Sequence, residues 1–256
     1  MLAQTTTTVE TARWFRTYAA RPNARVRLVC FPHAGGAAAA FRDLSGRLPA
    51  TVELTAVQYP GRQDRYGEPP APDLDTLAGE IATAVEPLLD RPVAFFGHSL
   101  GATVAFETAR RLSSRYRPAL RHLFASARRA PAVPNQGPGI GHDDASVLAY
   151  VRGLGGTGAA LLEDEDLREM ALPVLRADFR LVDTYRYSPG APLLCPITAV
   201  VGAEDGACRP EHARRWAECT AAGFDLRVLP GGHFYPETHP AELTALLTGA
   251  LGVPAV

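Results

Sequence analysis

The sequence predicts an α/β fold in which a mostly parallel sheet is flanked by helices. Short apolar segments that are typical of buried strands alternate with segments whose apolar residues have helical spacing. Such alternation is typical of a parallel sheet that is covered on both faces. The strand-like segments are residues 26–31, 52–59, 93–96, 122–127, 196–202 and 224–229.

Helical spacing separates these strands. Between residues 73 and 89, for example, Leu74, Leu77 and Ile81 recur on one helix face. A proline-rich segment precedes that helix, and we expect residues 1–11 to form a loose tail. One predicted helix follows the glycine-rich loop at 32–36 and runs through about residue 48. The others cover 102–112, 210–222 and a last helix opened by His239-Pro240.

The whole-chain composition excludes several function classes. The chain has 256 residues, 46% hydrophobic and 21% charged, which fits one soluble α/β domain with an insertion. A formal net charge of −1 gives no strong bias toward nucleic acid or an anionic membrane. All basic residues are arginine, and these can still form local anion-binding patches. Neither a nucleic acid nor a membrane is therefore expected as a partner.

The ends and the cysteines predict a cytoplasmic setting. The polar start lacks a charged region followed by an apolar core, so no secretory signal is expected. No apolar run approaches the roughly 18 residues of a spanning helix. The four cysteines are scattered without a Cys-x-x-Cys motif, which makes metal and disulfide sites poor interpretations. They are Cys30, Cys195, Cys208 and Cys219.

The most informative motif is Gly97-His98-Ser99-Leu100-Gly101. It follows an apolar strand and opens a helix, and this context makes Ser99 a candidate nucleophile on a strained turn. The glycines allow the neighbouring backbones to approach closely, and the helix N-terminus favours negative charge where an oxyanion would form. Gly-x-Ser-x-Gly also arises by chance, so the motif alone does not establish a nucleophile. A catalytic interpretation requires an acid and then a histidine base later in the chain.

Both partners are present after late strands. Glu204 and Asp205 follow the strand at 196–202, and either carboxylate could be the acid of a triad. His233 follows the strand at 224–229 and is the candidate base. His239, which precedes a proline, fits a helix start better.

Two backbone N–H groups are candidates for an oxyanion hole. Ala34 lies in the glycine-rich loop after the first strand, where such loops direct an N–H at a substrate oxygen. Leu100 follows the candidate nucleophile and supplies the second N–H. His33, in the same loop, is better explained as a structural histidine than as a proton-transfer group.

Residues 131–190 interrupt the strand pattern. They contain glycine- and proline-rich loops and helical pieces, and Pro173 is expected to start a further helix. We interpret this segment as a helical lid inserted into a core formed by residues 1–130 and 191–256. The alternative is a stabilising helical excursion without a gating role.

Five motifs in order give the chain a recognisable pattern. It resembles the type II thioesterases, α/β-hydrolase-fold enzymes that edit polyketide and nonribosomal peptide synthesis. The resemblance covers nearly the whole chain and implies Ser99, Asp205 and His233 as triad, with Ala34 and Leu100 as oxyanion donors. It thereby favours Asp205 over Glu204. The motifs are residues 31–36, 59–62, 97–101, 179–183 and 231–234.

The resemblance also implies a substrate and a partner. Such enzymes hydrolyse acyl groups from the phosphopantetheine arm of acyl or peptidyl carrier proteins and clear stalled or misprimed chains. No cofactor is implied beyond the phosphopantetheine of the substrate, and a monomer that meets its carrier in trans is expected. Since carriers are usually acidic, Arg128 and Arg129 are docking candidates, although ordinary solvated arginines would look the same in sequence.

Three other functions share these features. The same triad serves hydrolases of acyl-CoA, esters or peptides, and it also serves acyltransferases that pass the acyl group to an alcohol or amine. A binding protein that keeps the fold without the chemistry is disfavoured by the complete Ser, Asp and His set.

Overall fold

The computed structural model describes residues 10–253 except 114–119, 134–139 and 142. The tail expected at 1–11 therefore lies mostly outside the described residues, and residues 10–14 form a helical turn. Within the described part, no helix is long and apolar enough to cross a bilayer. All four cysteines are buried and free.

The predicted sheet is present, with seven strands among the described residues in the order β1-β3-β2-β4-β5-β6-β7. Only β1 is antiparallel to its neighbour; the pairs from β3 to β7 are all parallel. A parallel sheet brings the carboxyl ends of its strands to one edge, which is where ligands bind in such folds. The strands are β1 Phe15–Arg16, β2 Val26–Phe31, β3 Val52–Val57, β4 Val93–His98, β5 Leu120–Ser126, β6 Ile197–Gly202 and β7 Phe224–Leu229.

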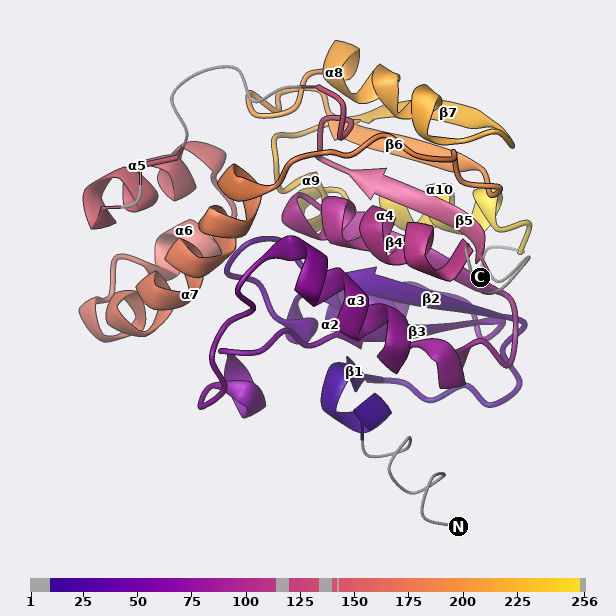
Figure 1. The fold of residues 1–256 in the computed structure, drawn as a ribbon, viewed down its shortest axis with the longest axis horizontal. Coiled ribbons are helices and arrows are strands. Elements are labelled where there is room, and N and C mark those ends of the chain that lie inside the picture. The colour runs from indigo at the N-terminus through magenta and orange to yellow at the C-terminus, as the bar shows by residue number, and fades with distance from the viewer. Residues whose placement is uncertain (1–9, 114–119, 134–139, 142, 254–256) are drawn as a thin grey trace.

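Alternate strand residues pack into two separate cores. On β2, Val29 and Phe31 join the core beneath α3 (Leu74–Ala84) and α4 (Leu100–Ser113), whereas Leu28 joins the other core. That second core is covered by α2 (Arg42–Arg47) and α10 (Pro240–Ala250), which lie behind the sheet in Figure 1. The period-two alternation thus produces the helix–sheet–helix layering that the sequence predicted.

Several helices are shorter than their sequence pattern. Helix α3 starts at Asp73, whose side chain accepts a hydrogen bond from Thr76 N at 2.6 Å, but it ends before a 3-10 turn that contains Pro87. The proline has no N–H to continue the ladder. The remaining short elements are η1 Ala38–Phe41, η2 Gln63–Arg65, η3 Glu86–Leu88, α8 Pro210–Arg214, η4 Arg215–Cys219 and α9 Tyr235–Thr238.

The described residues of the segment 131–190, here called the insertion, contain three helices, α5 (Asp144–Leu154), α6 (Thr157–Leu161) and α7 (Glu165–Thr184). Figure 1 shows them beyond the end of the sheet toward which the arrows of β2 and β5 point. The insertion has a small core of its own, in which Val147 of α5 packs with Leu175 and Phe179 of α7. This placement sets the insertion beside the strand ends where the site is expected.

The expectation that Pro173 starts a helix is wrong. Pro173 lies inside α7. Asp164 is the N-cap residue of this helix, and its carboxylate accepts a hydrogen bond from Leu167 N at 3.0 Å. A proline inside a helix costs about 3 kcal/mol. In α7 the Asp164 cap stabilises the helix before Pro173, and the burial of Val174 and Phe179 stabilises the helix after it.

Candidate active site

Ser99 occupies the tight turn between β4 and α4. Its φ of 54° is a left-handed value that non-glycine residues rarely adopt. The Ser99 N–H donates to the carbonyl of Ser126 on β5 at 2.8 Å, which fixes the turn against the neighbouring strand. A Cβ at Gly97 or Gly101 would lie 2.3 or 2.1 Å from backbone oxygens, so only glycine fits there. The partly exposed serine is thus held at the edge of the sheet.

His233 and Asp205 meet at the same edge. His233 Nδ1 lies 2.9 Å from Asp205 Oδ2, and the two residues are 4% and 5% exposed. The other carboxylate oxygen accepts the N–H groups of Ala207 and Cys208 at 2.8 and 3.2 Å. With the carboxylate ionised, Nδ1 donates and Nε2 is left as an acceptor. This arrangement fixes the orientation of the imidazole and leaves Nε2 available as an acceptor.

The other acid left open by the sequence lies elsewhere. The Glu204 side chain is exposed, and its backbone N–H donates to Gly231 O at 2.9 Å. Of the two neighbouring carboxylates, Asp205 is therefore the one that contacts the histidine.

His233 lies near His98, the residue before Ser99, but makes no hydrogen bond with Ser99 itself. His233 Nε2 is buried and has no hydrogen-bond partner among the described residues. The ring of His98, next to Ser99 in sequence, lies 5.3 Å from the His233 ring, centroid to centroid. Hydrogen bonds of this kind are often long until substrate binds.

The two candidate oxyanion donors lie at the ends of adjacent strands. Leu100 is the first residue of α4 and is fully buried, so its N–H is one that the helix itself leaves without an acceptor. Ala34 follows β2, which lies beside β4 in the sheet. Its neighbour Gly35 donates its N–H to Asp178 Oδ2 of α7 at 2.7 Å. The Ala34 loop is thus tied to the insertion.

Sequence reasoning missed a hydrogen-bond chain beneath the turn. His98 Nδ1 lies 2.8 Å from Ser126 Oγ, and that hydroxyl lies 2.6 Å from Tyr235 OH. Burial, followed by the charges of His233 and His33, lowers the pKa of His98 well below its usual value. His98 is therefore neutral at pH 7 and serves to hold the turn. His98, which stands between Gly97 and Ser99 in the Gly-x-Ser-x-Gly motif, was its only signal in the sequence.

His33 is also neutral. Burial, reinforced by the charge of His233, lowers the pKa of His33 to about 4. Its ring packs edge-on against Phe234, with centroids 5.0 Å apart. A packed, neutral ring fits the structural role expected from the sequence.

A cavity of about 640 Å³ opens beside the first turn of α4 and the end of α7. Arg128 donates from Nε to Thr103 Oγ1 at 3.0 Å, and Arg129 donates from Nη2 to Ala207 O at 3.3 Å. Both arginines are half-buried, unlike ordinary solvated ones. The cavity is lined by Thr103, residues 128–133, Val182, Asp183, residues 185–187 and Pro189.

The insertion contacts the site from a second side. The N–H of Thr157, where α6 begins, donates to Glu237 Oε2 at 2.9 Å. A Cβ at Gly156 would lie 2.5 Å from the ring of Phe234, which is the residue after His233. The segment before α6 therefore lies against the histidine loop, as α7 lies against the Ala34 loop. In the described part of the chain, no group of three or more His, Cys, Asp or Glu side chains could hold a metal ion.

Comparisons with known proteins agree on one family. The profile of the thioesterase domain matches residues 26–249. The chain is 42% identical to the thioesterase PikA5 of Streptomyces venezuelae over 228 residues, covering 89% of this chain and 81% of that protein. It is 44% identical over 240 residues to a probable cadicidin biosynthesis thioesterase of Streptomyces griseus, covering 94% of this chain but only 66% of that protein.

A solved structure gives the same result. The type II thioesterase BorB from the borrelidin biosynthetic cluster superposes with a TM-score of 0.84 and 40% identity, covering 93% of this chain and 97% of that one. The resemblance inferred from the motifs, and the α/β-hydrolase fold that it implies, are thereby confirmed. The chain belongs to the thioesterase family, and its relatives include type II thioesterases of polyketide and nonribosomal peptide pathways.

Proposed function

We propose that this protein is a serine thioesterase that hydrolyses acyl groups from the phosphopantetheine arm of acyl or peptidyl carrier proteins. It would thereby remove aberrant or stalled units in polyketide or nonribosomal peptide synthesis. The observation that carries the chemistry is the buried Asp205–His233 hydrogen bond at the strand edge that also bears Ser99. The carrier-bound substrate is supported by relatives described as type II thioesterases of such pathways.

The proposed mechanism has two steps. His233 Nε2 takes the proton of the Ser99 hydroxyl as Oγ attacks the thioester carbonyl, and it returns that proton to the departing thiol. Water then attacks the acyl-enzyme with the same histidine as base. Asp205 holds the imidazole tautomer, and the N–H groups of Ala34 and Leu100 stabilise the oxyanion. Each oxyanion donor is worth about 100- to 1000-fold in rate.

The insertion is proposed as a lid over this site. Its contacts with the Ala34 loop through Asp178 and with the histidine loop through Thr157 and Glu237 support that role. A segment that touches both halves of a site can shape the acyl pocket and exclude water.

We place the carrier beside Arg128 and Arg129, at the cavity of about 640 Å³. Carriers are usually acidic, and charges at the rim of an interface mainly speed association. Replacing both arginines by glutamate should lower kcat/KM for carrier-bound thioesters by about tenfold, with little effect on a small thioester. Unchanged hydrolysis of both substrates by the folded variant would refute this docking site.

Acyl release from a panel of acyl carrier proteins tests the function. Matching acyl-CoA and simple ester substrates are compared, with Ser99→Ala as the control. A clear kcat/KM advantage for carrier-bound thioesters supports the proposal and identifies the preferred acyl chain. Equal or better activity on esters or acyl-CoA would point to a general hydrolase, and transfer to an added alcohol or amine would point to an acyltransferase.

A further inference from the structure

A buried ion pair joins the segment after β3 to helix α7 of the insertion. Arg62 Nη1 lies 2.6 Å from Asp178 Oδ2, and Arg62 Nη2 lies 2.9 Å from Asp178 Oδ1, so the pair is bidentate. The two residues are 6% and 2% exposed. Burial acts to lower the pKa of Arg62, but the charge of Asp178 and its hydrogen bonds with Arg62 together outweigh burial, and the pKa is raised. The guanidinium and the carboxyl group thus face each other in a site with very little solvent exposure.

The same two side chains hold the backbone of the Ala34 loop. Asp178 Oδ2 accepts the Gly35 N–H at 2.7 Å, and Arg62 Nη1 donates to Gly36 O at 3.1 Å. Gly35 has a φ of +76°, and a Cβ on it would lie 2.5 Å from Leu175 Cδ2 of α7. The peptide groups that directly follow Ala34 are therefore fixed by charge-assisted hydrogen bonds and by close packing.

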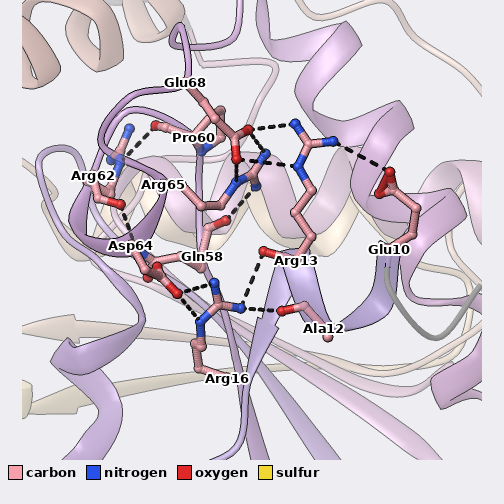
Figure 2. Close-up of polar contacts among 10 residues, drawn as sticks. All are labelled: Glu10, Ala12, Arg13, Arg16, Gln58, Pro60, Arg62, Asp64, Arg65 and Glu68. Carbon is pink, nitrogen blue, oxygen red and sulfur yellow. Dashed lines mark hydrogen bonds and ion pairs between the residues drawn. The ribbon is translucent and has the colours of Figure 1, made fainter. Parts of the chain in front are cut away.

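The backbone at Arg62 is fixed by contacts within the segment that follows β3. The Gln58 side chain donates to Arg62 O at 3.0 Å and accepts the Ala38 N–H at 2.9 Å, so it links the segments that follow β2 and β3. Arg65 donates to Gln58 O at 2.9 Å and pairs with Glu68, which also binds Arg13 near the N-terminus. Figure 2 shows the contacts among Gln58, Arg62, Arg65, Glu68 and Arg13. These contacts fix the backbone at Arg62. The Arg62 side chain therefore reaches the Ala34 loop from a fixed position.

We propose that Arg62 and Asp178 are positioning residues that aim the Ala34 N–H at the reacting carbonyl oxygen. They act through the backbone of Gly35 and Gly36 and touch no reacting atom themselves. Because Asp178 belongs to the insertion, the position of α7 sets the geometry of the oxyanion hole. The inference rests on the proposed function, since it assigns a role to two residues outside the triad of that site.

The test needs variants that separate positioning from folding. Asp178→Asn removes the charge but keeps an oxygen that can accept from Gly35. The double variant Arg62→Met with Asp178→Leu removes the pair and leaves no buried charge unpaired. If Asp178→Asn does not fold, this double variant still tests the positioning role. Glu53→Gln is the matched control, because it breaks the buried Arg27–Glu53 pair at the other end of the sheet.

Two quantities are measured on folded protein: kcat and KM for a thioester, and the affinity for a boronic acid that forms a tetrahedral adduct on Ser99. A misplaced oxyanion donor should lower kcat by about 10- to 100-fold with KM within about threefold. Boronate affinity should fall in parallel, with a larger loss in the double variant than in Asp178→Asn. Glu53→Gln should keep the kcat and the boronate affinity of the wild type.

Wild-type kcat and boronate affinity in the folded double variant would overturn the inference. An equal kcat loss in Glu53→Gln would also overturn it, because destabilisation alone would then explain the effect. Failure of the proposed function is distinguishable, because it would appear in other measurements: the wild type would show no preference for carrier-bound thioesters, or Ser99→Ala would retain turnover.

Discussion

The amino and carboxyl ends of the strands differ in what their buried ion pairs connect and in where positive-φ residues occur. At the amino ends, Arg27 of β2 pairs with Glu53 of β3 at 2.9 Å, and these residues are also register partners in the sheet. At the carboxyl ends, Arg62 pairs with Asp178, and the pair reaches across to a different structural unit. The first pair joins two strands that are already neighbours, whereas the second joins the core to the insertion.

Residues with a strained backbone also lie at the carboxyl ends of the strands. The non-glycine residues with positive φ in the described part of the chain are Gln63, Ser99 and Ala127, and all three follow the carboxyl ends of strands. The unpartnered Nε2 atoms of His98 and His233 lie there too. Strain and unsatisfied polar groups cost stability, and they persist where the rest of the fold enforces them. The positive-φ residues and the two unpartnered histidine nitrogens support the proposal that the chemistry lies at the carboxyl ends of the strands.

The largest expected effect is at Ser99. Ser99→Gly should reduce turnover by about 10⁶-fold, because the nucleophile is gone. It should also be about 1 kcal/mol more stable than Ser99→Ala, because glycine adopts a φ of 54° without strain. Steady-state kinetics and urea unfolding measure the two effects. A Ser99→Gly protein no more stable than Ser99→Ala would contradict the strain argument.

The next effect separates the two neighbouring acids. Asp205→Asn should lower kcat by about 10⁴-fold, because the amide favours the wrong imidazole tautomer. Glu204→Gln, one residue away and exposed, should stay within about twofold of the wild type. The two variants are compared in the same thioester assay. A larger loss in Glu204→Gln than in Asp205→Asn would reassign the acid.

At the amino ends the expected effect is on stability alone. Glu53→Gln should lower the free energy of unfolding by about 2 to 3 kcal/mol, because the buried Arg27 guanidinium loses its buried carboxylate partner and keeps only Asp90, whose side chain is 50% exposed. Denaturant unfolding measures the loss, and kcat measured below the transition should equal that of the wild type. If unfolding were unchanged, this end of the sheet would not have the stabilising role given to it here.

The smallest expected effect is a pH dependence near the amino end of β5. Burial lowers the pKa of His122 to about 4, from 6.5 in an unfolded chain. Between those values the unfolded state binds more protons, so stability falls as the pH drops from 6.5 to 4 and His122 adds no further loss below 4. The His122 contribution is about 2 kcal/mol.

The control for this pH effect is His122→Gln, whose amide can still reach Thr198, the present partner of His122 at 2.9 Å. Unfolding free energies at pH 6.5 and pH 4 are compared for the two proteins. The variant should lose about 2 kcal/mol less than the wild type over that range. Equal losses in both proteins would show that His122 does not titrate in this window.

Much of the fold was predictable because its signals are local. Strand and helix periodicity extends over a few residues, and the glycine-flanked Ser99 lies in one short motif. The positions of Asp205 and His233 also followed from a local rule, since each comes directly after a strand of a parallel sheet. Fold and family are confirmed; the roles of these residues stay predictions.

What the sequence could not supply depends on contacts between distant segments. Nothing near Asp178 indicates that it pairs with Arg62, since 116 residues separate them. Pro173 was misread for a related reason: its local signal is a helix start, and tertiary burial of the residues after it overrides that signal. The link from His98 through Ser126 to Tyr235 likewise spans three separate elements.

The Arg62–Asp178 pair also has a consequence for the order in which the enzyme matures during synthesis. A chain made from its N-terminus exposes Arg62 long before Asp178 leaves the ribosome, and the strands around Arg62 can begin to pair in that interval. Until α7 arrives, the guanidinium has no matched carboxylate and the Gly35 N–H has no acceptor from that helix. If Arg62 and Asp178 have the positioning role proposed above, the nascent chain can contain Ser99 before the Ala34 loop is fixed, and hydrolytic competence would be acquired only once α7 packs against that loop.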